Sequence, residues 1–117
     1  RLHYALLEKE MALYPKITKA RDYFGHAAEQ FIGFAMRDMA IARDFYALNR
    51  KYKQPLPEYY TFKHLAILYE NRREYDKAIA VCQKSLAEGY RSDGTKGGMQ
   101  GRLDRLKKLK SAVGESR

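Results

Sequence analysis

The sequence predicts an all-α fold, and three observations carry this prediction. Apolar residues recur at three- and four-residue steps through most of the chain, as they do along one side of a helix. No stretch alternates apolar and polar residues over the length of a strand. Proline occurs only at Pro15, Pro55 and Pro57, and glycine is sparse before Gly89. We therefore expect about five helices, packed as antiparallel hairpins within a single domain of ordinary size.

The first helix is predicted within residues 1–17. Its apolar residues recur at helical spacing, and they are Leu2, Leu6, Leu7, Met11 and Tyr14. Tyr14 precedes Pro15, and a residue before proline avoids the α region. We therefore expect the helix to end or kink at Tyr14.

Residues 18–54 hold the most helix-prone stretch, which extends to Asn49, and Thr18 is a candidate N-cap for it. A straight helix over this stretch would span roughly 48 Å, whereas a compact domain of this size is only about 35 Å across. Two alternatives stay open. The stretch forms one long helix, or it folds as a degenerate helical hairpin that turns near Arg37–Asp38.

The second half of the chain predicts three further helices, after a basic connector that contains Pro55 and Pro57. The first runs from about Glu58 to Asn71 and the second from about Tyr75 to Glu88. Gly89 suits the left-handed position that ends a helix. The last helix, over residues 97–113, carries apolar residues on one side and Arg105, Lys107, Lys108 and Lys110 on the other.

The glycine-rich run between the last two helices raises the question of a phosphate site. A phosphate-binding loop of the Walker type needs a lysine after its last glycine and a strand before it. Here Lys96 precedes Gly97 and Gly98, and no strand is predicted. Amide groups at the start of the last helix, with Lys96 and Arg102 nearby, leave an anion site open as an alternative. We interpret the run as a connector.

The segment PEYYTFKHLAILYENRREYDKAIAVCQKSLAEGY resembles the tetratricopeptide repeat, a helix–turn–helix unit of about 34 residues. Bulky and small residues stand where that family packs its two helices, and they are Phe62, Leu65, Ala66, Tyr69, Ala78, Cys82, Ser85 and Leu86. The resemblance covers residues 59–92, and a weaker echo covers residues 21–54. It implies a right-handed superhelix of helical hairpins, in which the last helix acts as a cap.

The resemblance also implies a binding surface. Family members hold their ligands on one side of the first helix of the repeat, which corresponds to Tyr60, Lys63, His64, Ile67, Glu70 and Asn71. Lys63 matches a lysine that binds a peptide carboxylate in some members, whereas Ile67 stands where those members have asparagine. We therefore expect a protein-binding or scaffolding module whose partner is a protein or peptide segment, acidic or amphipathic in character.

The charge balance supports a second hypothesis. Lysine and arginine number 23 against 14 acidic residues, which gives a net charge of +9. Such a surface attracts acidic partners, so an RNA- or DNA-binding domain is the alternative. Arg50, Lys51 and Lys53 surround Tyr52, and the last helix provides a further basic surface.

No enzyme, cofactor or metal is predicted. His3, His26 and His64 have no metal-binding spacing, and Cys82 is the only cysteine and is expected to be an inert buried thiol. A single thiol is typical of a reducing compartment, and no apolar run approaches the length of a membrane span. We expect a cytoplasmic module that is part of a larger protein.

Overall fold

The computed structural model describes residues 2–45, 47 and 59–115. Five helices and no strand are found in this part of the chain, which confirms the all-α prediction. The chain forms two compact units, residues 1–61 and 62–117, and each is described by itself. The right-handed superhelix stays a prediction. Within the described ranges, no helix combines the length and the apolar character that crossing a membrane requires.

Helix α1 (Leu2–Ala20) passes through Pro15, so it does not end at Tyr14 as one of the two predicted outcomes had it. Proline cannot donate the hydrogen bond to the carbonyl of Met11. Pro15 is exposed and the Met11 side chain is 71% exposed, so water can reach that carbonyl. Tyr14 packs near Phe31, with ring centroids 5.4 Å apart. Burial of the next turn outweighs the local preference of proline.

Helix α2 (His26–Phe45) begins later than predicted, and a turn at residues 21–25 separates it from α1. Thr18 is not its N-cap, because the Thr18 hydroxyl donates back to the Tyr14 carbonyl at 3.2 Å within α1. Helix α2 also runs unbroken through Arg37–Asp38, so no hairpin turn lies there. The predicted helix would have been longer than a compact domain is wide. The chain avoids this by turning at residues 21–25, where Arg21 adopts φ 53°.

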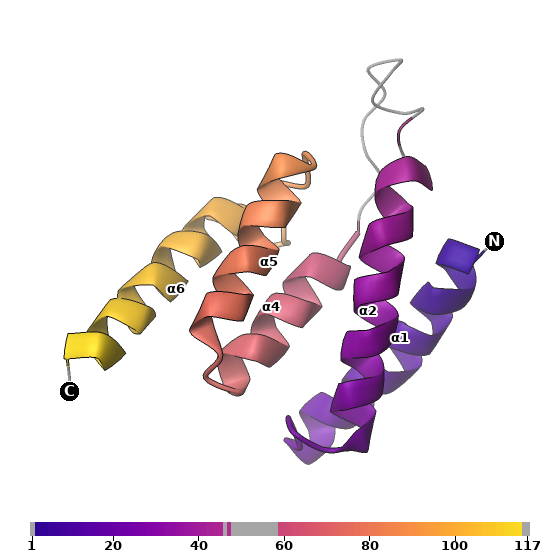
Figure 1. Cartoon of the computed structure of the whole chain (residues 1–117), viewed down its shortest axis with the longest axis horizontal. Coiled ribbons are helices and arrows are strands. Elements are labelled where there is room, and N and C mark those ends of the chain that lie inside the picture. The colour runs from indigo at the N-terminus through magenta and orange to yellow at the C-terminus, as the bar shows by residue number, and fades with distance from the viewer. Residues whose placement is uncertain (1, 46, 48–58, 116–117) are drawn as a thin grey trace. The chain divides into compact units, whose positions relative to one another are not determined.

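Helices α1 and α2 form an antiparallel pair (Figure 1). Small and large side chains alternate along the buried side of α2, and the alanines let the backbone of α1 approach. The fully buried apolar residues of this pair are Leu6, Ile17, Ala28, Phe31, Ala35, Met39 and Ala42. Because the pair already forms a hairpin around residues 21–25, the repeat-like hairpin predicted within residues 21–54 is not present in that form.

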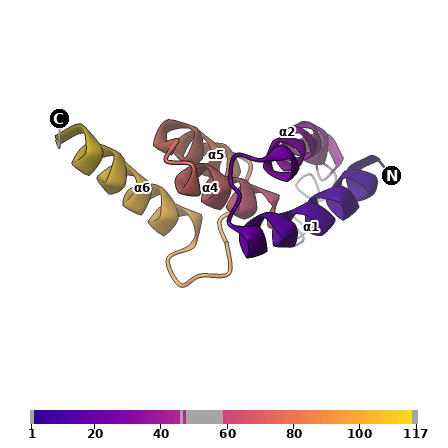
Figure 2. The ribbon, with the colours of Figure 1, turned by 90° about the horizontal axis from the view of Figure 1, so that it is seen from below.

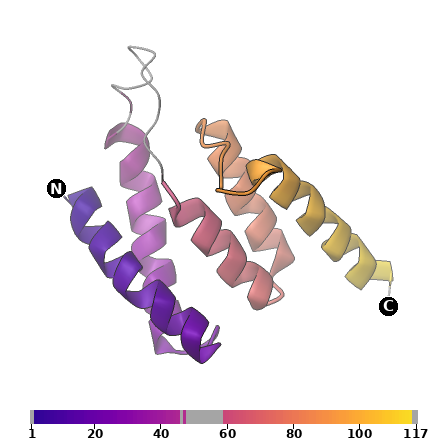
Figure 3. The same ribbon diagram turned by 180° about the vertical axis from the view of Figure 1, so that it is seen from behind.

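Helices α4 (Thr61–Asn71) and α5 (Tyr75–Ala87) run antiparallel, close to the predicted bounds (Figure 3). The turn after α4 places Arg73 at φ 62°, with Glu74 N–H donating to the Tyr69 carbonyl at 2.9 Å. Helix α5 ends in the same way. Gly89 has φ 91°, and Tyr90 N–H donates to the Ser85 carbonyl at 2.9 Å. The prediction that Gly89 ends this helix is confirmed.

Helix α6 (Gly98–Glu115) returns alongside α5, so α4, α5 and α6 follow one another in chain order (Figure 2). Met99, Leu103 and Leu106 are its buried residues. The expected packing residues of the repeat-like segment are buried, apart from the half-buried Leu86; they are Phe62, Leu65, Ala66, Tyr69, Ala78, Cys82 and Ser85. The helix pair is confirmed, and membership of the repeat family stays a prediction.

Candidate functional site

Five of the six predicted binding residues lie on α4. Lys63, His64, Ile67 and Glu70 are half-buried there and Asn71 is exposed at the end of the helix. At 100° per residue these five positions share one side of α4. Tyr60 lies before α4, 37% exposed, and belongs to the first unit. The structure therefore brings five of these residues to one surface of the second unit, whereas Tyr60 is part of the first unit.

Glu70 is held by Arg105 of α6. The guanidinium donates two hydrogen bonds to the carboxylate, from Nη1 at 2.8 Å and from Nη2 at 2.9 Å. Such a two-point contact fixes the orientation of both groups better than a single bond. The arginine is half exposed and the glutamate is less so. Glu70 was predicted to contact the binding partner directly. In the structure it orients the guanidinium of Arg105 on α6.

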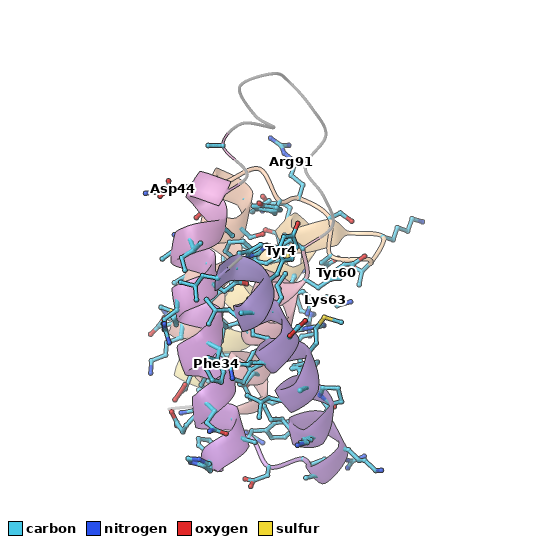
Figure 4. The ribbon with its side chains drawn as sticks, turned by 90° about the vertical axis from the view of Figure 1, so that its right-hand side faces the viewer. Tyr4, Phe34, Asp44, Tyr60, Lys63 and Arg91 are labelled. Carbon is cyan, nitrogen blue, oxygen red and sulfur yellow. The ribbon has the colours of Figure 1, made fainter. Side chains whose placement is uncertain are left out.

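His64 reports the charge of this surface. Burial lowers the pKa of His64 to about 4, and the positive charges of Lys63 and Arg102 lower it further. The imidazole is therefore neutral at pH 7, and two cationic side chains lie near it. Lys63 projects from α4 toward the loop after α5 (Figure 4). A Cβ added to Gly94 in that loop would lie 3.6 Å from Nζ of Lys63.

The loop between α5 and α6 is organised by Asp93. Its buried carboxylate accepts hydrogen bonds from the Thr95 amide at 2.9 Å and from Arg102 Nε at 2.8 Å, and the Thr95 hydroxyl also donates to it. Arg102 itself is nearly buried. The position that an anion would take beside Arg102 is thus occupied by a carboxylate of the chain. This supports the interpretation of the glycine-rich run as a connector.

A cavity of about 420 Å³ lies at the start of α6. Its lining is formed by Asp93, Thr95, Gly97, Gly98, Gly101, Arg102 and Arg105. It adjoins α4 through the pair of Arg105 with Glu70. We call this surface the α4–α6 face, and it consists of Lys63, His64, Ile67, Glu70, Asn71, Arg102 and Arg105.

The first unit contains a buried polar cluster that sequence reasoning missed. Asp38 of α2 is fully buried, and its carboxylate accepts hydrogen bonds from Nδ1 of His3 in α1 and from the Tyr59 hydroxyl at 2.5 Å. Thr61 Oγ1 donates to the same carboxylate at 3.4 Å. His3 lies beside Tyr4, with ring centroids 5.3 Å apart, near the beginning of α1 (Figure 4).

Glu10 completes this cluster. It is only 3% exposed, and neither of its carboxyl oxygens has a hydrogen-bond partner among the described residues. Burial raises the pKa of Glu10 to about 8, and the neighbouring Asp38 raises it further. Burial and Asp38 also raise the pKa of the Tyr59 hydroxyl. Glu10 is therefore largely protonated at pH 7, which is how a carboxyl group tolerates such a site.

Within the described ranges, neither an activated nucleophile nor a metal site is formed. Burial raises the pKa of Cys82 to about 11, which keeps the thiol protonated and unreactive. No group of three or more histidine, cysteine, aspartate or glutamate side chains within residues 2–45 and 59–115 is arranged to hold a metal ion. The basic–aromatic cluster around Tyr52 lies outside the described residues.

Comparison with protein-family models, with curated proteins and with solved structures gives no match to this chain.

Proposed function

We propose that the chain is a non-enzymatic binding module whose α4–α6 face holds a protein segment that carries carboxylates. The position of Lys63 beside the half-buried His64 is the observation that carries this proposal. Burial is the main cause of the low pKa of His64, and the charge of Lys63 adds to it. The same charge lowers the free energy of a carboxylate brought to this place. The half-buried Ile67 adds apolar contact area beside these charges.

The pair of Arg105 with Glu70 suits this role. Arg105 is half exposed while it binds Glu70 through two hydrogen bonds, so its fork is held in place at low entropic cost before a ligand arrives. A ligand carboxylate would contact the outer side of that guanidinium. Glu70 then sets the geometry of the face, and Lys63 supplies charge.

His64 provides a direct test by NMR. The probe is a 12-residue peptide that alternates leucine with glutamate, and its control replaces every glutamate with glutamine. We expect the acidic peptide to raise the pKa of His64, because a bound carboxylate favours the protonated imidazole. The glutamine peptide should leave the titration of His64 where it is. Equal effects of both peptides, or none from either, would contradict the proposal.

Charge reversal on the face gives a second test. Lys63→Glu combined with Asn71→Ala should weaken binding of the acidic peptide at least tenfold and leave the helical circular dichroism unchanged. Lys107→Glu is the matched control, because it makes the same charge change at an exposed position of α6. Position 107 lies about 160° around the helix from Arg105. If both variants weaken binding equally, net charge rather than the face is responsible.

Nucleic-acid binding is the alternative that the net charge of +9 favours. Three basic residues of α6 already form ion pairs within the unit, since Arg102 binds Asp93, Arg105 binds Glu70 and Lys110 binds Asp76 at 2.5 Å. Contact with phosphates would make the affinity fall steeply with salt. A titration of a fluorescent single-stranded RNA and of the acidic peptide at two salt concentrations separates the hypotheses.

A further inference from the structure

The buried cluster of the first unit joins three separate parts of that unit. His3 and Glu10 come from α1, Asp38 comes from α2, and Tyr59 and Thr61 come from the segment that leads into α4. All five are at most 6% exposed. Asp38 stands at the centre, since it accepts a hydrogen bond from His3, from Tyr59 and from Thr61. This single carboxylate ties the end of the unit to the α1–α2 hairpin.

Glu10 is the unusual member of the cluster. Asp38 has donors on both of its oxygens, whereas Glu10 has none among the described residues. Two neighbouring carboxyl groups in a buried site cannot both ionise without a large cost. The proton of the pair therefore stays on the group that lacks donors, which is Glu10.

We propose that this cluster is a proton-controlled latch. While Glu10 keeps its proton, Asp38 holds Tyr59 and Thr61 on the α1–α2 hairpin. When Glu10 loses the proton, two buried negative charges face each other and the segment of residues 59–61 is released, so that water reaches both carboxylates. This inference concerns the first unit and does not depend on the binding role of the α4–α6 face.

The described groups around Glu10 offer no other way to balance the second charge. On α1 the titratable neighbour is His3, which already donates to Asp38. On α2 it is Asp38 itself, and in the segment before α4 it is the Tyr59 hydroxyl, whose own ionisation burial opposes. The nearby Thr61 hydroxyl acts to lower the pKa of Glu10, but burial and Asp38 outweigh it. Opening the segment is the remaining way to hydrate the charge.

Hydrogen exchange of the full chain tests the latch. Rates are corrected for the intrinsic effect of pH and compared at pH 6.5 and pH 9.5 in a peptide that covers residues 59–66. We expect wild-type protection there to fall at least tenfold at the higher pH, and protection in Glu10→Gln to stay constant. Glu8→Gln is the matched control, because it makes the same change at an exposed position of α1 and should follow the wild type.

Tyr59→Phe distinguishes a latch from general weakening of the unit. In the wild-type background it should lower the thermal midpoint at pH 6.5 and have little effect at pH 9.5, where the hydroxyl is already released. In the Glu10→Gln background, Tyr59→Phe should lower the thermal midpoint at both pH 6.5 and pH 9.5. If Tyr59→Phe lowers the thermal midpoint equally at pH 6.5 and pH 9.5 in the wild-type background, the proposal is overturned.

A carboxyl titration of the wild-type chain removes dependence on any variant's folding. With glutamate labelled by ¹³C at the side-chain carboxyl, one resonance should titrate near pH 8, together with the loss of protection at residues 59–66. If every glutamate titrates below pH 6, or if the late resonance moves without any change in protection, the latch does not exist.

Discussion

Gly98 and Gly101 stand three residues apart at the start of α6, yet their surroundings differ sharply. Gly98 has φ 64°, and a Cβ added to it would lie 2.7 Å from the carbonyl oxygen of Arg91. That oxygen belongs to the backbone and accepts the Met99 amide at 2.8 Å, so it cannot move aside without losing this bond. A Cβ added to Gly101 would meet nothing within 4 Å.

We predict opposite effects of alanine at these two glycines. Gly98→Ala should destabilise the chain by about 2 kcal/mol or more, because left-handed backbone alone costs about 1–2 kcal/mol for a residue with a side chain and the clash adds to it. Gly101→Ala should stabilise by about 0.5–1 kcal/mol, since alanine favours a helix interior. Urea unfolding at pH 7 measures both. A stable Gly98→Ala variant would mean that the loop is not constrained.

Single residues also explain why sequence reasoning missed the buried cluster. Asp38 lies in the buried row that contains Ala35, Met39 and Ala42, and Glu10 lies in the buried row of α1. An acid within an apolar row was a readable signal. One of the two alternatives placed a turn at Asp38 instead, and the partners of Asp38, His3 and Tyr59, are distant in sequence. Spacing alone does not reveal such partners.

At the scale of helices, local patterns predicted the second unit better than the first. The bounds of α4, α5 and α6 follow from helical periodicity and from Gly89, which are properties of neighbouring residues. The path of α1 through Pro15 and the turn at residues 21–25 depend on packing between α1 and α2. Five of the six predicted binding residues share a side of α4 because helix geometry fixes this. That Arg105 of α6 binds Glu70 could be found only from the structure.

The loop between α5 and α6 depends on Asp93, and we predict that Asp93→Ala costs about 2–3 kcal/mol. The substitution leaves Arg102 nearly buried without its carboxylate and removes the acceptor of Thr95. Asp104→Ala is the control, because Asp104 is exposed on α6, the helix that carries Arg102, and its loss should cost less than about 0.5 kcal/mol. Urea unfolding measures the free energy of unfolding of both variants. Equal losses would show that the contacts of Asp93 with Arg102 and Thr95 do not stabilise the loop.

At the scale of the whole molecule, the two units respond to pH in opposite directions. In residues 1–61, burial and Asp38 raise the pKa of Glu10 above its ordinary value of 4.5 to about 8. The folded unit therefore binds more protons than the unfolded chain, and stability falls as pH rises from about 4.5 through 8.

In residues 62–117 the signs are reversed. Burial and two cations lower the pKa of His64 from 6.5 to about 4. For Asp93, burial acts to raise the pKa, but the hydrogen bonds from Thr95 and Arg102 outweigh it and lower the pKa below 3.8. The unfolded chain then binds more protons, so the stability of this unit falls as pH drops through 6.5 toward 4 and further below 3.8.

We predict that alkaline and acidic conditions loosen different halves of the chain. Hydrogen exchange, corrected for intrinsic rates, should show loss of protection in α2 on going from pH 7 to pH 9 and in α5 on going from pH 7 to pH 4.5. Glu10→Gln should abolish the alkaline loss in α2 and leave the acidic loss in α5 unchanged. His64→Gln should abolish the acidic loss in α5 and leave the alkaline loss in α2 unchanged, because it removes the group that gains a proton on unfolding near pH 5. If α2 and α5 lose protection at the same pH in the wild type, the buried acid of the first unit and the histidine of the second do not act locally, and the opposed pH responses would be wrong.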